Sequence, residues 1–172
     1  MDLENMTDDN KIELAYNPNT TGVTLHQLAE DESWRVRFHV AENKNTPVDI
    51  LRKLAQDIHN SIRANIAYNR NTPVDLLNEL SKDAYYGTKC NVAENPNTPE
   101  DTLQYLAKAY DWEVRESVAE NPKSSSNLLV VLFEHEKSFK EPEGDVIKSL
   151  YANINFPAFA KRVIETLYGE ML

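Results

Sequence analysis

The chain has 172 residues, of which 41% are apolar and 27% charged, and its formal net charge is −10. This composition excludes a disordered chain, and the negative charge disfavours long-range attraction to phosphate backbones or anionic membranes. The single cysteine, Cys90, excludes an internal disulfide, no apolar run approaches the roughly 20 residues of a membrane span, and no secretion signal is visible, so we expect a cytoplasmic protein.

A short motif recurs along the chain with a fixed period. Alanines occupy one position in five successive copies spaced 26 residues apart, at Ala15, Ala41, Ala67, Ala93 and Ala119. A sixth copy, residues 151–157, returns to register if six extra residues lie between Phe133 and Val146. Self-similarity at a period of about 20 to 50 residues predicts a solenoid, in which each unit buries its apolar face against its neighbours. We expect one domain over residues 1–172, with an insertion at 134–145 and a C-terminal capping repeat at 146–172.

Each unit opens with the signals of a helix start. The sequence Thr46-Pro47-Val48-Asp49 offers a hydroxyl as N-cap, a proline at the first helical position and a carboxylate at the third, and two later units repeat it. This pattern predicts a first helix, helix A, with an apolar stripe of leucines three residues apart. The leucine pairs are Leu25/Leu28, Leu51/Leu54, Leu77/Leu80, Leu103/Leu106 and Leu129/Leu132.

A second apolar pattern follows helix A in each unit. Val36 and Val40 are four residues apart, as are Ile62 and Ile66, which predicts a shorter helix B of one to two turns. We expect helix B to end at an asparagine such as Asn43, a residue suited to a left-handed C-cap. No alternation of period two is long enough for a sheet, so the sequence predicts an all-α fold of about six helix pairs.

The segment of residues 92–122, VAENPNTPEDTLQYLAKAYDWEVRESVAENP, resembles the variant leucine-rich repeat. The resemblance extends from about Lys11 to Pro157 and includes the broader HEAT and armadillo class. It implies a right-handed superhelix in which an α-helix alternates with a short, often 3-10, helix, and it implies a binding function. Some family members hold an iron–sulfur cluster on N-terminal cysteines, but this chain has none before Cys90, and a cluster needs about four thiolates.

Charged residues also recur at a fixed spacing. Asp57 precedes Arg63 by six residues, and we expect the aspartate to cap helix B and to pair with a basic residue of its own or the next unit. On this interpretation, replacing Arg63 leaves Asp57 without its partner. Cations that bind phosphate would not need a carboxylate at fixed spacing, so a structural role is favoured. The other members are Asp31/Arg37, Asp83/Lys89, Asp111/Arg115 and Lys11.

The turn asparagines share one position in the repeat. Because asparagine side chains bond the local main chain, we expect a structural ladder here rather than readers of bases or sugars. The members are Asn17, Asn43, Asn69, Asn95, Asn121 and Asn153.

Residues suited to catalysis do not form a recognisable set. No two of the four histidines share a position in the repeat, Cys90 has no recurring general base, and the chain has only four glycines, too few for a phosphate loop. We predict no enzymatic activity, no cofactor and no metal site.

The positions of helix B that lie off its apolar stripe vary between units, as the binding face of a solenoid does. They grade from basic and aromatic in the first unit to acidic in the fourth. We predict that this face binds a protein or peptide, anchored by the aromatic end and oriented by the glutamates. The candidate residues are Trp34, Arg35, Phe38, His39, Tyr68, Tyr86, Trp112, Glu113, Glu116 and Glu120.

Two functions therefore remain open. The first is a non-catalytic adaptor, monomeric and without affinity for nucleic acid or membrane. The second is a HEAT-like protein that binds nucleic acid or repairs DNA, which a positive stripe on this face would favour and the glutamates oppose.

Overall fold

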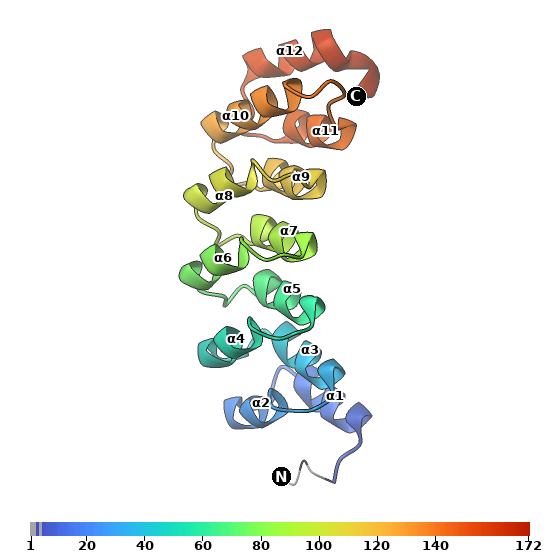
Figure 1. Cartoon of the computed structure of the whole chain (residues 1–172). Coiled ribbons are helices and arrows are strands. Elements are labelled where there is room, and N and C mark those ends of the chain that lie inside the picture. The colour runs from blue at the N-terminus through green and yellow to red at the C-terminus, as the bar shows by residue number, and fades with distance from the viewer. Residues whose placement is uncertain (1–2, 4) are drawn as a thin grey trace.

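The computed structural model describes residue 3 and residues 5–172, and it is a stack of short helices (Figure 1). These residues form twelve α-helices and a final 3-10 helix, with no β-strand among them. The predicted all-α solenoid is confirmed. The odd-numbered helices are α1 (Asp8–Tyr16), α3 (Trp34–Glu42), α5 (Asn60–Tyr68), α7 (Tyr86–Glu94), α9 (Trp112–Glu120) and α11 (Gly144–Ala152). The even-numbered helices are α2 (Gly22–Leu28), α4 (Val48–Leu54), α6 (Val74–Leu80), α8 (Glu100–Leu106), α10 (Ser126–Lys137) and α12 (Ala158–Tyr168), followed by η1 (Gly169–Met171).

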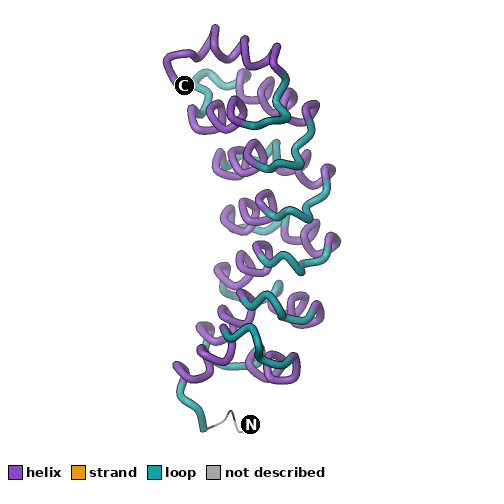
Figure 2. Tube along the Cα trace, turned by 180° about the vertical axis from the view of Figure 1, so that it is seen from behind, coloured by secondary structure: helices purple, strands orange, loops and turns teal. Residues whose placement is uncertain are grey.

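The helices form two columns. The even-numbered helices are the helices A of the repeat, and α2 to α10 make one column, whereas the odd-numbered helices are the helices B and make the other (Figure 1). The last helix, α12, lies across the C-terminal end of the stack (Figure 1). Each helix B contacts the helix B of the next unit, from α1 through to α11. Seen from behind, the loops link the two columns once per helix, and the two ends of the chain lie at opposite ends of the stack (Figure 2). The column of helices B is therefore one continuous layer with an outer face.

Helix B is longer than the predicted one to two turns, and in four units it is also longer than helix A. The helices B from α1 to α11 have nine residues each, whereas α2, α4, α6 and α8 have seven. Helix B is also α-helical throughout, not 3-10. The fifth helix A, α10, has twelve residues, and four of its residues, 134–137, fall in the region predicted as an insertion.

Three of the predicted helix caps are wrong. His59, not Asp57, is the N-cap of α5, and the Asp57 carboxylate accepts from the His59 amide at 3.0 Å. Pro47 is the N-cap of α4, and the hydroxyl of Thr46 instead donates to the carbonyl of Val40, 2.5 Å away at the end of α3. Asn43 is the C-cap of α3, but its φ of −66° and ψ of 122° are extended, not left-handed. The extended conformation arises because the chain leaves helix B directly into the turn, where the Thr46 hydroxyl satisfies a helix-end carbonyl that a left-handed cap would otherwise cover.

One apolar core runs the length of the stack. The repeated alanines of the helices B, Ala15 to Ala119, are fully buried, and the predicted leucine stripe of helix A is buried in the same core cluster. Burial of each leucine contributes about 1.5–3 kcal/mol. No unit could bury these faces alone, so the units depend on their neighbours.

One core position carries an unsatisfied hydroxyl, which generates a stability prediction. Thr88 is fully buried, and its Oγ1 has no hydrogen-bond partner, at the position that Val36, Ile62 and Val114 hold in other units. We expect Thr88→Val to raise the free energy of unfolding by about 1 kcal/mol, because it removes an unpaired polar group at constant shape.

Urea or guanidinium denaturation measures this difference. The matched control is Thr72→Val, which removes the hydroxyl that donates to the carbonyl of Ile66 at 2.5 Å and should lower the free energy of unfolding. A loss of stability in Thr88→Val would contradict the prediction.

Candidate functional site

The turn asparagines tie each unit to the one before it. Asn69 accepts a hydrogen bond from the amide of Asn71 (2.9 Å) and donates through Nδ2 to the carbonyls of Ala41 and Asn43, both at 3.0 Å. Equivalent bonds to the preceding unit are made by Asn43, Asn95, Asn121 and Asn153. The predicted structural role is confirmed, and the bonds extend beyond the local turn to the preceding helix B.

A second asparagine of the same turn, which the sequence analysis did not single out, forms a parallel row. Asn97 donates to the carbonyl of Arg70 at 2.6 Å, and Asn45, Asn71 and Asn155 make the equivalent bond to the turn before theirs. The signal was present in the sequence, because asparagine recurs two residues after the first one.

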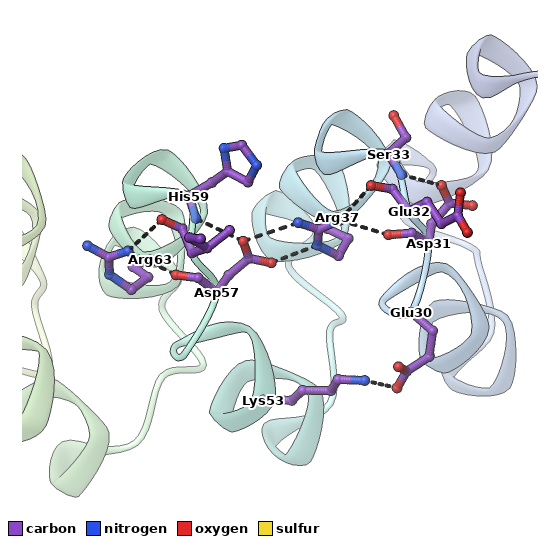
Figure 3. A network of polar contacts seen from close by, with 10 residues as sticks. Glu30, Asp31, Glu32, Ser33, Arg37, Lys53, Asp57, His59 and Arg63 are labelled. Atoms are coloured by element: carbon purple, nitrogen blue, oxygen red, sulfur yellow. Dashed lines mark hydrogen bonds and ion pairs between the residues drawn. The ribbon is translucent and has the colours of Figure 1, made fainter.

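The charged ladder connects units rather than closing within one (Figure 3). Arg37 donates from Nε and Nη2 to the carboxylate of Asp57, at 2.6 and 3.2 Å, and Arg63 makes the same pair of bonds to Asp83, at 2.6 and 3.0 Å. The expected pairing of Arg63 with the Asp57 side chain is therefore wrong. Within a unit, Arg63 Nη1 donates instead to the main-chain carbonyl of Asp57 at 2.9 Å. The six-residue spacing places the guanidinium against the end of helix A, while its other edge reaches the next unit.

These ion pairs are largely shielded from solvent. The carboxylates of Asp57 and Asp83 are both 7% exposed. Burial alone would raise the pKa of Asp83, but the hydrogen bonds from Arg63 and from the amide of Tyr85 outweigh it, so the pKa lies below its ordinary value of 3.8. The resulting stabilisation is present above pH 3.8 and is lost as the pH falls through the lowered pKa.

All five basic members of the ladder have carboxylate partners. Lys11 binds Asp31 at 2.8 Å, and Lys89 binds Asp111 at 2.7 Å. Arg115 binds Glu136 in an ion pair with exposures of 3% and 0%, and its guanidinium lies 5.0 Å from the ring centre of Phe139. Sequence reasoning missed Glu136, because the extra residues shift it out of register. The ladder cations are thus engaged within the scaffold.

The aromatic end of the predicted site forms a groove on the outer face of the helix B column. Its volume is about 370 Å³, and it is lined by Ile12 from α1, Trp34, Arg35, Phe38 and His39 from α3, and Ser61 from α5. The rings of Trp34 and Phe38 meet edge to face with centroids 6.3 Å apart, and Trp34 stacks on His59 at 5.5 Å. Trp34 remains 42% exposed. Ile12 was missed, although it holds the position of Phe38 one unit earlier.

Arg35 differs from the arginine two residues later. Arg37 is committed to Asp57, whereas Arg35 is exposed and has no hydrogen bond or ion pair with the described residues. His39 is held by Glu42 at 3.1 Å. The groove therefore combines apolar walls with one free cation.

The acidic end lies on α7, α9 and α11. Burial raises the pKa of Glu116, and the nearby carboxylates of Glu120, Asp145 and Glu113 raise it further. Burial is the main reason that the pKa of Glu94 is raised, and the nearby Glu120 raises it further. A hydrogen bond of 3.4 Å from Ser117 lowers it in part. Glu113, Glu116 and Glu120 thus lie close together. Glu94 and Asp145 join them; they occupy the positions of Glu120 and Glu113 in neighbouring units.

The acidic end contains few compensating cations. Lys148 binds Asp145 at 3.5 Å within α11, and Lys89 on α7 is occupied by Asp111. Ser149 donates to Glu120 at 3.2 Å. Like charges therefore remain close together on this part of the face.

The middle of the face is lined by small and aromatic residues. Ser61, Ala64 and Cys90 occupy its central positions on α5 and α7. A Cβ atom on Gly87 would lie 2.5 Å from Cε1 of Tyr85, so the ring of Tyr85 lies over this glycine. Sequence reasoning missed Tyr85; a glycine at a position held elsewhere by a side chain was the available signal.

The remaining predicted residues lie apart from both ends. Tyr68 and Tyr86 are 64% and 43% exposed on α5 and α7, between the groove and the glutamates. Trp112 is half-buried and packs against the core, so it is partly structural.

Catalytic and metal-binding chemistry has little support in the described part of the chain. No three His, Cys, Asp or Glu side chains in residues 3 and 5–172 converge as metal ligands. Burial, the largest cause, and nearby carboxylates raise the pKa of the Cys90 thiol to about 11, which keeps it protonated at neutral pH and weakly nucleophilic. None of the described helices has both the length and the apolar character to span a bilayer.

The fold and this face define a helical repeat scaffold. A family model described as "Leucine rich repeat variant" matches residues 34–57, which comprise α3, its turn, α4 and the ladder residue Asp57. The predicted resemblance to this family is therefore confirmed.

Other comparisons are more distant. A solved structure described as a leucine-rich repeat variant with a novel repetitive protein structural motif is 20% identical, with a TM-score of 0.40. The match covers 87% of this chain and 67% of that chain. A comparison with curated proteins finds no match.

The corrected ladder leads to a stability prediction. We expect Arg63→Ala to lower the free energy of unfolding by about 1–3 kcal/mol, because it leaves the buried carboxylate of Asp83, not that of Asp57, without its charged partner. Arg52→Ala is the control, since Arg52 and Asp75 are 47% and 67% exposed, and an exposed pair contributes about 0–1 kcal/mol. Denaturant melts of equal midpoint for Arg63→Ala and wild type would contradict this account.

The acidic end leads to a prediction about pH. The pKa of Glu116 in the folded state lies above its ordinary value of 4.5, so the folded state is penalised as the pH rises from 4.5 through the raised pKa. We expect Glu116→Gln to stabilise the fold at pH 7 by about 0.5 kcal/mol, the scale of a partly exposed charge interaction, and to have no such effect below pH 4.5.

Thermal or denaturant melts across this pH range provide the measurement. Glu79→Gln, which removes one negative charge at an exposed position on α6 outside the carboxylate cluster, is the control for the change in net charge. A constant difference between Glu116→Gln and wild type at every pH would count against a strained carboxylate cluster.

Proposed function

We propose that this protein is a non-catalytic scaffold that binds a protein or peptide through the outer face of its helix B column. The observation that carries the proposal is the groove of about 370 Å³ around Trp34 and Phe38. Buried aromatic residues and arginine dominate the binding energy of protein interfaces, and here exposed or half-buried aromatic rings lie beside the unpaired Arg35. A cytoplasmic monomer with no cofactor is part of this proposal.

The alternative, nucleic-acid binding, has weaker support. The five ladder cations that recur in register are paired with carboxylates, and the far end of the same face is acidic. Affinity for nucleic acid depends on free cations that displace counterions from phosphates. Submicromolar binding to duplex DNA at physiological salt, with a steep salt dependence, would favour this alternative.

Variants on the two faces test the scaffold proposal. We expect Trp34→Ala and Phe38→Ala to weaken partner binding by about 1–4 kcal/mol, as truncation of interface anchors does. Tyr105→Ala is the matched control. Tyr105 is also an exposed aromatic residue, with 55% of its surface accessible, but it lies on α8 in the helix A column. Phe38 also packs partly against the core, so melting temperatures are measured first, and Trp34→Ala decides the result if Phe38→Ala is unstable.

The measurement is quantitative affinity capture from cell extract, followed by titration calorimetry with the captured partner. Partners retained by wild type and by Tyr105→Ala but lost by Trp34→Ala support the proposal. Equal capture by all variants would show that the outer face of the helix B column is not the binding surface, and loss only in Tyr105→Ala would indicate the helix A side.

A further inference from the structure

The face that we propose for binding has two chemically different ends, and both face the same side of one continuous layer. The groove lies on α1, α3 and α5, and the carboxylates lie on α7, α9 and α11. A single ligand that contacts both ends must therefore run along the stack, across successive helices B. This inference rests on the proposed function and specifies its ligand.

The groove end selects a large apolar side chain. Its walls are the edge-to-face pair of Trp34 and Phe38, with Ile12 contributed by the preceding helix B. Aromatic rings pack favourably in offset or edge-on geometry against a further ring. Arg35 is free to bind an acidic side chain or a carbonyl beside that apolar residue.

The acidic end selects basic side chains. Among the described residues, no lysine or arginine pairs with Glu94, Glu113, Glu116 or Glu120, whereas the ladder carboxylates have such partners. The one nearby exposed pair is Lys148 with Asp145. A basic ligand would reduce the repulsion between these carboxylates, because it would place positive charges beside them.

The surface between the two ends favours an extended ligand over a helical one. Ala64 and Cys90 are short, which lets a ligand main chain approach closely beside the exposed rings of Tyr68 and Tyr86, and the ring of Tyr85 covers Gly87 as a flat contact. An α-helix is about 10–12 Å wide and would hold its own main chain away from these residues.

The spacing of the helices sets the length of the ligand. The groove centres on α3 and the glutamates on α9, three helix B steps later. Packed helices lie about 8–10 Å apart, so the two ends are about 25–30 Å apart. An extended chain advances about 3.3 Å per residue and spans this distance in about eight residues.

We propose that the outer face of the helix B column binds an extended segment of a partner protein, with a large aromatic side chain in the groove and basic side chains about eight residues away against the carboxylates.

Synthetic peptides with stiff spacers test this arrangement. Each peptide carries a phenylalanine at one end, two arginines at the other and a spacer of two, five, eight, eleven or fourteen prolines, in both chain directions. Proline spacers form a semi-rigid helix that rises about 3.1 Å per residue, so they act as rulers. Fluorescence anisotropy with the full chain measures the affinity of each peptide.

We expect one chain direction to bind at least about 10-fold more tightly with eight prolines than with two, because only the longer spacer lets both ends bind at once. Trp34→Ala, and separately the triple variant Glu113→Gln/Glu116→Gln/Glu120→Gln, should each abolish this dependence on spacer length. Glu79→Gln on α6 should leave it unchanged. Affinity for the eight-proline peptide should also fall with increasing salt and as the pH is lowered toward 4.5.

Absence of binding, or an affinity independent of spacer length, would overturn the two-ended ligand. So would a spacer dependence that persists in the triple variant. These outcomes are distinguishable from failure of the scaffold proposal, which is tested by the dependence of natural partner capture on Trp34. Capture that requires Trp34, together with proline peptides that bind regardless of spacer, would leave a scaffold whose ligand uses the groove alone.

Discussion

The fold depends on polar groups of one unit that are satisfied only by the next. The amide of each turn asparagine from Asn43 to Asn153 donates to carbonyls near the end of the preceding helix B, and each ladder cation donates to a carboxylate one unit further on. A buried donor or acceptor left without a partner costs about 1–3 kcal/mol, so a unit that slips or separates loses several such bonds at once. The leucine and alanine core supplies most of the stabilising free energy, but it is non-directional. The two polar ladders fix the register in which the core closes.

These ladders also decide which residues are available for binding. Arg37 and Arg63 share one position in the repeat and are held on both edges, whereas Arg35 projects from a position that no neighbouring unit satisfies. The same division separates carboxylates. Asp57 and Asp83 have lowered pKa values because guanidinium groups outweigh their burial, whereas Glu94 and Glu116 have raised ones because burial and their like-charged neighbours are not offset. Strain of this kind is typical of surfaces that are retained for binding at some cost in stability.

Repetition explains how much of the structure could be predicted from the sequence. A period of 26 residues, with apolar pairs at helical spacing, was sufficient for the helix pairs, the solenoid and the buried leucines. Direction in space was harder to predict. The spacing of Asp57 and Arg63 was read correctly as structural, yet the partner of Arg63 is Asp83, because a side chain that crosses to the next unit leaves no trace in local spacing. Glu136 was missed for a related reason, since the extra residues that carry it break the register. The groove residues of α3 could be predicted because their positions vary between units, whereas core positions do not. Ile12 and Tyr85 were missed because their places on the face come from a contact with the next unit and from packing over Gly87.

Because the ladders repeat with every unit, the number of units can change without changing the residues at either end of the binding face. The 26 residues 58–83 contain one complete rung of each ladder, with Arg63 and Asp83 paired inside the segment and Asn69 bonding to the unit before it. A second copy of this segment, inserted in tandem, would find the donors and acceptors of both ladders matched, because each copy presents to its neighbours the same ladder groups that the original presents. The insertion would move the groove away from the glutamates by one helix spacing, about 8–10 Å, without altering either end. In this solenoid the number of repeats therefore sets the distance between the groove and the glutamates. The side chains of individual units set the chemistry of each end.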